Sequence, residues 1–261
     1  MKKMFTLVLA ILMIASLFTA CGAAKAPETD LAYIKDKGKL VVGITDYAPM
    51  DYKDENGSWT GFDAEFAQLF AKELGVECEF YVIADWGKKF MELDTKQIAA
   101  VWNGMPITEE AKLNSSVSNP YFVNAQVVVM KADVVADYDY MESLNGLTIA
   151  VENGSAGQDA ANTITGATVV PLQDQGAALL EVKAGTADAC VIDITMAYAM
   201  TGEGTDYADL AAGLSLTEEL YGVSFRKDSD VTAVFNDFMA KIKADGTLQA
   251  LADKYALTLA E

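Results

Sequence analysis

Residues 38–76 read GKLVVGITDYAPMDYKDENGSWTGFDAEFAQLFAKELGV and contain a complete strand, turn and helix. The run KLVVGI is apolar and rich in β-branched residues, which predicts a buried strand. DENG is a turn signal, and GFDAEFAQLFAKELG then carries apolar residues at helical spacing. Gly75 stands where a left-handed C-cap would end that helix. A strand followed in this way by a helix is typical of α/β architecture.

The same alternation continues through the next hundred residues. MELDTKQIAAVWNG (residues 91–104) and LLEVKAGTADACVID (residues 179–193) share a pattern of helix, short polar turn, apolar strand and a polar residue at the strand's end. KLVVGITD and LTIAVENGS likewise match as opening strands followed by polar turns. The repetition predicts two similar α/β lobes with largely parallel strands.

Ligands of open α/β sheets gather beyond the carboxyl ends of the strands. The polar residues at those ends are Asp46, Asn103, residues 153–155 and Asp193. If the lobes face each other, these residues converge on a cleft between them.

The N-terminus predicts export. Residues 1–20, MKKMFTLVLAILMIASLFTA, place two lysines before an apolar run and small residues, as a secretory signal peptide does. LFTAC with the next Gly resembles the lipobox of bacterial lipoproteins, although Phe18 stands where Leu is commoner. This resemblance implies a mature chain that starts at a lipid-modified Cys21, outside the cytoplasm, with residues 21–35 as a membrane tether. A plain secreted protein with a chance cysteine is the alternative.

Composition argues against several function classes. The 261-residue chain has no His and only one Arg, Arg226, which argues against a His-based triad or zinc site. Removal of the signal's two lysines and no acid moves the formal net charge from -19 to -21, which argues against nucleic acid as a partner. Cys78 and Cys190 lie in apolar strand-like runs, so we expect buried free thiols.

Several segments, taken in order, carry a family resemblance. They are residues 38–76, DW (85–86), WNGMPITEE (102–110), NPY (119–121), GSAG (154–157), VID (191–193), YGVSFRKDSD (221–230) and ADGTLQALADKY (244–255). Together they resemble bacterial solute-binding protein family 3, the extracytoplasmic receptors of amino-acid-type ABC importers. The match covers nearly all of the mature chain.

The resemblance implies a two-lobed periplasmic-binding-protein type II fold with the ligand cleft between the lobes. Lobe one would hold residues 36–123 and 222–261, and lobe two residues 124–221. Cys78 and Cys190 would then lie in separate lobes, so no disulfide joins them. The implied protein is a monomer that closes on a small polar solute by hinge motion and delivers it to an ABC permease and its ATPase.

The resemblance also implies roles for individual residues. Tyr47 and Trp86 take the places of aromatic residues that stack on the ligand. Asp193 matches the aspartate that accepts hydrogen bonds from the ligand's α-ammonium, and Ser155 matches a hydroxyl of the turn in lobe two. The full predicted ligand-binding set is Asp46, Tyr47, Trp86, Asn103, Gly104, Met105, Ser155 and Asp193.

The chain departs from the family where an α-carboxylate is normally held. Pro106 stands in place of Thr or Ser, and Ala111 in place of Arg, so a hydroxyl, an amide donor and a guanidinium are lost. Lys112 points about 100° away on a helix and is a poor substitute. We therefore expect an amine-bearing or neutral polar solute, held by Asp193 with help from Glu152 or Asp46. Trp102 is either a further aromatic wall or a core residue.

Two other classes of function share this architecture. Some periplasmic dehydratases and cell-wall lytic enzymes resemble it, but the sequence offers no activated nucleophile, metal cluster or phosphate loop. We therefore expect a non-catalytic protein without a cofactor. The third class is a ligand-sensing subunit that reports to a membrane receptor.

Overall fold

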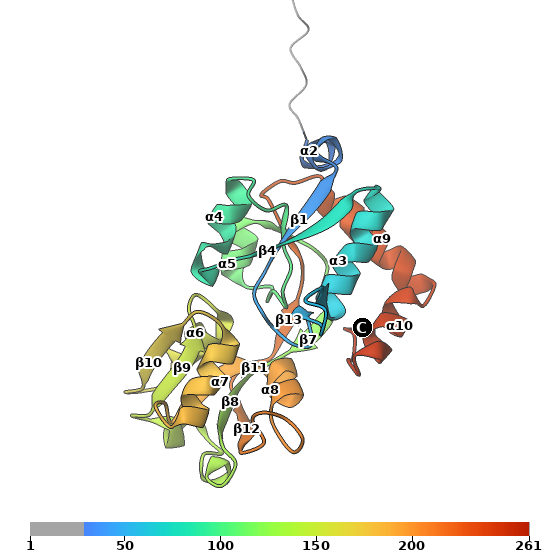
Figure 1. Ribbon diagram of the computed structural model, residues 1–261. Coiled ribbons are helices and arrows are strands. Elements are labelled where there is room, and N and C mark those ends of the chain that lie inside the picture. Colours follow the sequence, from blue (N-terminus) through green and yellow to red (C-terminus); the bar gives the residue numbers. More distant parts are fainter. Residues whose placement is uncertain (1–28, 261) are drawn as a thin grey trace, which may run out of the picture.

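The computed structural model describes residues 29–260, and these form two lobes, each built around a five-stranded sheet (Figure 1). The predicted signal peptide and Cys21 lie outside the described residues. The first sheet has the order β4 (Glu77–Val82), β1 (Lys39–Ile44), β5 (Ala100–Val101), β14 (Ser224–Phe225) and β6 (Ser116–Val117). The second has the order β10 (Thr168–Leu172), β9 (Thr148–Glu152), β11 (Ala189–Asp193), β8 (Gln126–Lys131) and β12 (Leu210–Ser215).

The two sheets follow the same plan. In each, the first three strands are parallel, and the returning strands β14 and β8 are antiparallel to them. Strands β7 (Phe122–Asn124) and β13 (Glu219–Tyr221) pair antiparallel where the chain passes between the lobes. The predicted two-lobed α/β fold is confirmed. The sheets are mixed and not largely parallel, because two of the four strand pairings in each are antiparallel.

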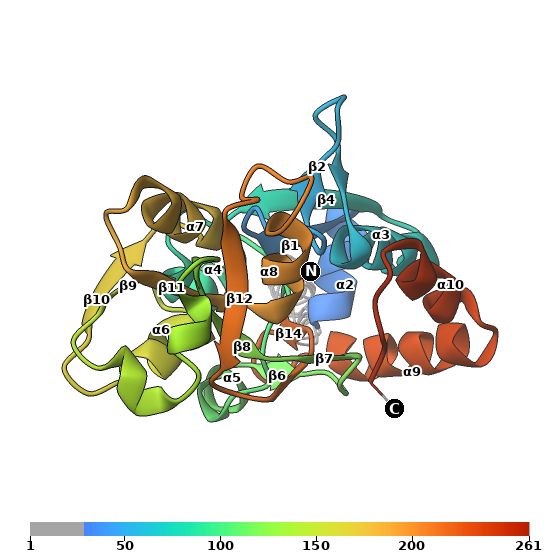
Figure 2. The same cartoon turned by 90° about the horizontal axis from the view of Figure 1, so that it is seen from below.

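Helices cover both sheets. In the first lobe they are α2 (Asp30–Lys37), α3 (Phe62–Leu74), α4 (Lys89–Asp94), α5 (Glu109–Asn114), α9 (Val231–Ala244) and α10 (Thr247–Lys254). In the second lobe they are α6 (Ala156–Ala161), α7 (Gln175–Ala184) and α8 (Ile194–Met200). The short elements are the 3-10 turns η1 (Trp86–Lys88), η2 (Val135–Asp137) and η3 (Met141–Leu144), and the hairpin β2 (Tyr52–Lys53) with β3 (Trp59–Thr60). Seen from below, this hairpin projects from the body (Figure 2).

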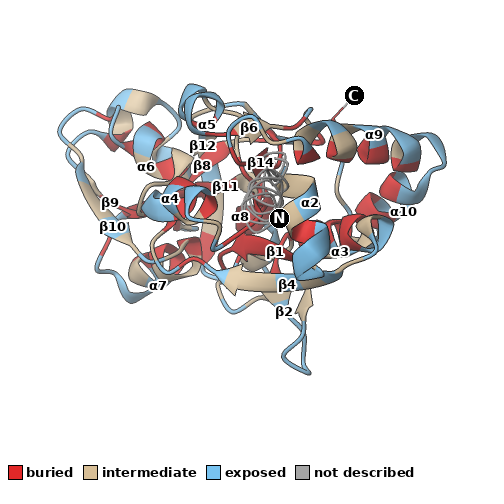
Figure 3. Cartoon of the chain, turned by 90° about the horizontal axis from the view of Figure 1, so that it is seen from above, coloured by how far each residue is buried: buried red, intermediate tan, exposed pale blue. Residues whose placement is uncertain are grey.

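The core of the first lobe is aromatic. Phe62, Phe66 and Phe70 recur at every fourth position of α3 and are fully buried, so one stripe of the helix packs on the sheet. The Trp102 ring meets Phe66 and Phe235 edge-on, at centroid distances of 4.9 and 5.0 Å. Trp102 is therefore a core residue and not a wall of the ligand site. Buried residues follow the strands and the inner sides of the helices (Figure 3).

Two expectations at the level of single elements need correction. The tether predicted over residues 21–35 is helical from Asp30, where α2 begins, because Thr29 caps the helix and Ile34 is buried against the lobe. Cys78 and Cys190 are both free, but only Cys190 is buried, since β4 lies at the edge of its sheet and leaves Cys78 partly exposed. Within residues 29–260 we find no helix long and apolar enough to cross a bilayer.

Arg226, the only Arg, joins parts of the first lobe that are distant in sequence. Its Nε donates to Asp30 Oδ1 at 2.9 Å, and its Nη1 donates to the carbonyl oxygens of Leu93 and Ile98 at 2.8 and 2.7 Å. These contacts tie α2 and the end of α4 to the strand that returns from the second lobe. The guanidinium thus has a structural role away from the cleft.

Replacing this residue by Arg226→Met should lower the free energy of unfolding by about 3 kcal/mol, because a partly buried carboxylate and two carbonyls lose their donor. Urea unfolding followed by tryptophan fluorescence measures the change. Lys227→Met is the control, since Lys227 is exposed and donates one hydrogen bond to the Lys112 carbonyl. Equal stability of the two variants would contradict the structural role.

Candidate ligand-binding site

The two lobes touch along one edge of the gap between them. Asn153, just after β9, donates from Nδ2 to Asp85 Oδ1 of the first lobe at 2.8 Å. The backbones of Gly87 and Gly154 lie so close that a Cβ on Gly154, whose φ is +71°, would sit 2.4 Å from the Gly87 Cα. Only glycine permits this approach. The lobes are therefore in direct contact at the ends of β4 and β9.

A small cavity of about 20 Å³ lies beside this contact. The first lobe contributes Trp86, Lys89, Met105, Pro106, Thr108 and Glu110 to its lining, and the second contributes Gly154, Ser155, Ala156 and Asp159. A single water needs roughly 10–15 Å³, so this cavity by itself is small. It shares Pro106, Thr108, Ala156 and Asp159 with a neighbouring hollow of about 620 Å³. The structure thus brings together three of the predicted site residues, Trp86, Met105 and Ser155.

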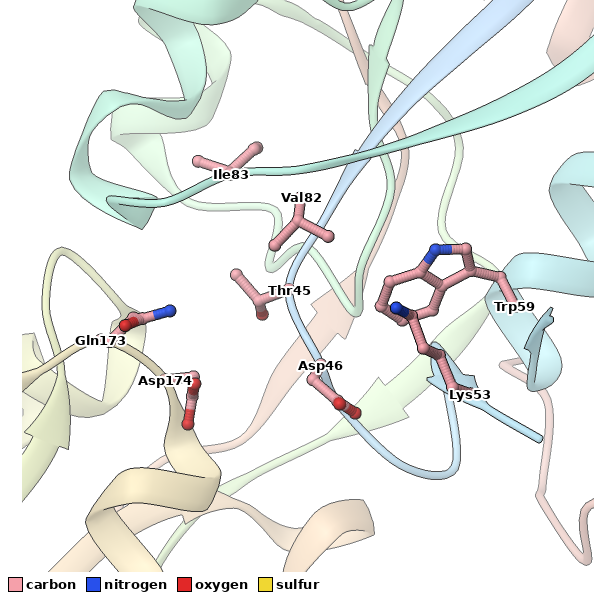
Figure 4. Close-up of a pocket in the computed structure, with 8 residues that line it drawn as sticks. All are labelled: Thr45, Asp46, Lys53, Trp59, Val82, Ile83, Gln173 and Asp174. Atoms are coloured by element: carbon pink, nitrogen blue, oxygen red, sulfur yellow. The ribbon is translucent and has the colours of Figure 1, made fainter. Parts of the chain in front are cut away.

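A second hollow of about 270 Å³ opens at another part of the gap (Figure 4). Asp46, which follows β1, and Asp174, which precedes α7, line it from opposite lobes. Burial raises the pKa of Asp46, the charge of Asp174 raises it further, and Lys53 opposes both. The Lys53 ammonium lies over the Trp59 ring, 5.3 Å from its centroid. This hollow therefore presents two carboxylates to anything that enters it.

The predicted anchor Asp193 is buried, and both of its carboxylate oxygens accept hydrogen bonds from the protein itself. Its Oδ1 accepts from Asn124 Nδ2 at 2.6 Å, from Gln126 Nε2 at 2.7 Å and from the Tyr221 hydroxyl at 2.7 Å. Its Oδ2 accepts from Gln175 Nε2. Burial raises its pKa, and these donors act in the opposite direction. A carboxylate oxygen has about two acceptor positions, so Oδ2, with one donor among the described residues, has room for a second.

Tyr47 belongs to the same hydrogen-bond network. Its hydroxyl bonds with the Tyr221 hydroxyl at 2.7 Å and with Thr195 Oγ1 of the second lobe. The ring is 1% exposed and packs so closely on Gly104 that a Cβ there would meet it at 2.5 Å. Tyr47 therefore joins the lobes through Thr195, and it lines neither hollow.

Asn103 and Gly104 hold the turn that follows β5. Asn103 Oδ1 accepts from the Thr45 amide at 3.0 Å and its hydroxyl at 2.7 Å, and Nδ2 donates to Asp51 at 2.7 Å. The Gly104 amide donates to Asp63 Oδ2 at 2.6 Å, with φ at +56°. All these polar atoms are engaged within the first lobe. Their roles as direct ligand contacts stay a prediction.

Ala111 and Lys112 lie where the sequence departs from the family pattern. Ala111 is fully buried among apolar side chains, so the position that carries Arg in the family packs into the core here. Lys112 is exposed and pairs with Glu109 at 2.8 Å, as its place on the helix predicts. Thr108 caps α5 by accepting from the Ala111 amide at 3.1 Å. Ala111 supplies no cation. Lys112, in contrast, lines a hollow of about 620 Å³ between the lobes, to which the second lobe contributes Asp159 and Glu218.

Lys89 is the site residue that the sequence reasoning missed. It is 4% exposed, and its Nζ donates across the gap to the Gly154 carbonyl at 3.0 Å. Lys89 thus places a cation near the position at which the sequence lacks the family's Arg. A signal was present in the sequence, because Lys89 shares the helical spacing of Trp86, Phe90 and Leu93 and so interrupts an apolar face.

Glu152 ends β9 at the same interface and is 3% exposed. Its Oε1 has no hydrogen-bond partner among the described residues. Burial, and then the charges of Asp193 and Asp174, raises its pKa to about 8, while Lys89 acts in the opposite direction. A buried oxygen without a hydrogen-bond donor is energetically costly in a folded protein. Such a group is a candidate for a ligand-binding position.

Comparison with known proteins agrees with this architecture. Residues 40–258 match the family described as bacterial extracellular solute-binding proteins, family 3. The chain belongs to that family. Among its relatives, the L-cystine-binding protein TcyJ of Escherichia coli (strain K12) is 29% identical over 233 residues, which cover 88% of this chain and 87% of TcyJ.

Two solved structures extend the comparison of this family 3 protein. The ancestral amino acid-binding protein AncCDT-1, a precursor of cyclohexadienyl dehydratase, is 32% identical with a TM-score of 0.78 over 86% of this chain and 98% of that one. The Gly52Ala mutant of arginine-bound ArgBP from T. maritima is 34% identical with a TM-score of 0.75 over 81% of this chain and 99% of that one.

The buried Glu152 should make stability depend on pH. Unfolding lowers its pKa from about 8 towards 4.5, so the unfolded chain binds fewer protons and stability falls as the pH rises through this window. In Glu152→Gln this loss is absent. Its free energy of unfolding should exceed that of the wild type by a margin that grows between about pH 5 and about pH 8.

Urea unfolding at both pH values measures this margin. Glu142→Gln, which removes an exposed carboxyl of the same lobe, is the control and should show no such growth. A margin for Glu152→Gln that stays constant with pH would show that the carboxyl titrates normally.

Proposed function

We propose that this chain is the non-catalytic ligand-binding component of an ABC importer for amino acids or related small polar, amine-bearing solutes. The observation that carries the proposal is the buried Lys89 ammonium together with the buried Glu152 carboxyl group, at the contact between two sheet-centred lobes. A charge at such a place is expensive unless a partner neutralises it. A solute bound between the lobes supplies that partner.

The proposed mechanism is closure of the two lobes on the solute. Residues 36–123 and 222–261 move as one body against residues 124–221, with the paired strands β7 and β13 as the connection. The cavity of about 20 Å³ is too small for an amino acid, which supports a gap that opens to admit its ligand. The closed form is the one presented to the permease and its ATPase.

The names of the similar proteins support an amine-bearing ligand and a binding role. TcyJ is named for L-cystine, and the T. maritima structure is described as arginine-bound. The ancestral protein is described as amino acid-binding although it precedes a dehydratase. In this chain Asp193 accepts hydrogen bonds from structural partners, Asp46 and Asp174 face one hollow, and Glu152 leaves one oxygen unpaired. We assign none of these groups to catalysis.

Isothermal titration of residues 22–261 with L-cystine, L-arginine, L-glutamine and agmatine tests the binding role. At least one of these amines should bind with one-to-one stoichiometry and raise the melting temperature, because it stabilises the folded form alone. Succinate and glucose, which carry no amine, are the control solutes and should give no heat. Absence of binding by every amine would overturn the proposed function.

We further propose that lipid on Cys21 anchors the mature protein, as a monomer, to the outer face of the cell membrane. The full-length chain expressed in a bacterium should fractionate with membranes, and Cys21→Ser should release it. Mass spectrometry of the N-terminal peptide identifies the lipid directly. Cys78→Ser is the matched control and should stay with the membranes, whereas release of both variants would point to a general loss of folding.

A further inference from the structure

Lys89 places a buried ammonium at the contact between the lobes. Its Nζ lies 3.0 Å from the Gly154 carbonyl oxygen and 3.5 Å from that of Trp86. It also lies over the faces of Trp86 and Phe90, at 5.3 and 5.1 Å from the ring centroids. An ammonium can donate three hydrogen bonds. Two carbonyl oxygens and two aromatic faces stabilise its charge less than a counter-ion would.

This ammonium has no ion-pair partner within residues 29–260. No carboxylate oxygen of that part of the chain lies within 4.0 Å of its Nζ. The lysines that do form ion pairs there, such as Lys88 with Asp85 at 3.1 Å, have side chains that are at least about a third exposed. Burial lowers the pKa of Lys89, which expresses the cost of its isolation.

The carboxylates nearest to the cavity do not remove this cost. Glu110 and Asp159 line the cavity with Lys89, but both are exposed and their charges are screened by solvent. A charge that binds directly to the buried ammonium acts in a medium of lower dielectric and is felt much more strongly. The cavity therefore favours an anion at Lys89 even though two acidic residues stand at its edge.

Lys89 lies in the region where this chain lacks the hydroxyl, the amide donor and the guanidinium of the family pattern. Pro106 lines the same cavity and has neither a hydroxyl nor an amide hydrogen to donate. Ala111 is buried without a polar group. On the other side of the interface, Glu152 leaves one buried oxygen unpaired. At the same interface, therefore, the Lys89 ammonium has no ion-pair partner and one Glu152 oxygen has no hydrogen-bond partner among the described residues.

We infer that Lys89 is the residue that holds the anionic group of the solute, and that this group is a carboxylate on a molecule that also carries an amine. The amine faces Glu152. This inference rests on the proposed function and narrows its solutes to zwitterions. Simple amines such as agmatine would fill only half of the site.

The contact between Lys89 and Gly154 also gives the carboxylate a part in closure. When the lobes separate, the ammonium leaves the Gly154 carbonyl and is hydrated. Closing without a solute buries it without a counter-ion, which is unfavourable. A carboxylate at Nζ removes that penalty and adds a charge-assisted hydrogen bond, so it stabilises the closed form more than the open one.

Titration with matched pairs of solutes tests the inference. The probes are L-arginine, L-lysine, L-glutamine and L-histidine, each compared with its α-carboxamide, which keeps the amine and removes the negative charge. The wild type should bind at least one acid about tenfold to a hundredfold more tightly than its amide. In Lys89→Met this preference should shrink to less than about threefold, mainly by loss of affinity for the acid.

Lys88→Met is the matched control. It removes the same charge from the adjacent position, but Lys88 is exposed and pairs with Asp85, so the preference for the acid should persist. Lys89→Gln, which keeps a donor for the Gly154 carbonyl, serves as a second variant if Lys89→Met does not fold.

Four outcomes count against the inference. Equal loss of preference in Lys88→Met would assign it to general charge, and an unchanged preference in the Lys89 variants would assign it to other groups. Amides that bind the wild type as tightly as the acids would overturn the Lys89 assignment and leave the proposed function standing. If no acid and no amide binds the wild type, the inference and the proposed function fail together.

Discussion

Asp193 ends strand β11 with a carboxylate that receives hydrogen bonds from Asn124, Gln126, Gln175 and Tyr221. These donors come from β7, β8, α7 and β13, so a single buried group ties the central strand of the second sheet to both strands that cross between the lobes. The arrangement is stable because both oxygens of the carboxylate accept hydrogen bonds, three at Oδ1 and one at Oδ2, whereas a buried carboxylate without donors is costly. These hydrogen bonds hold the second sheet in place relative to β7 and β13, the strands that connect the lobes.

The Tyr221 hydroxyl extends the network from Asp193 to Tyr47, and Tyr47 reaches back to Thr195 in the second lobe. The first lobe is thereby held at one side of the gap by hydroxyl groups. The other side is held by the backbone approach of Gly87 and Gly154. At this second contact the buried Lys89 ammonium also donates to the Gly154 carbonyl oxygen, so a cation lies where the lobes meet.

Family 3 proteins with Arg at the position of Ala111 would place a guanidinium beside the lobe interface, as the family resemblance implies. Here Ala111 has joined the apolar core, and the cation approaches from Lys89 at the start of α4. Lysine at this place is shorter in reach and carries a single charged atom, so it offers no planar fork for bidentate binding. The change of residue and direction would alter the orientation in which a carboxylate lies, and with it the side chain that the hollow between Asp46 and Asp174 receives.

The sequence by itself determined the two α/β lobes, the strand KLVVGI, the helix that ends at Gly75 and the polar residues at the strand ends, because these follow from local periodicity and from turn chemistry. It also placed Trp86, Met105 and Ser155 at the gap through the family resemblance. Only the tertiary structure decided that Trp102 lies in the aromatic core, that Asp193 is satisfied by four internal donors, and that Lys89 and Glu152 are buried at one interface. The physical reason is that burial and hydrogen-bond partners are set by segments far apart in the chain: Gly154 and Lys89 are 65 residues apart, yet they meet at 3.0 Å.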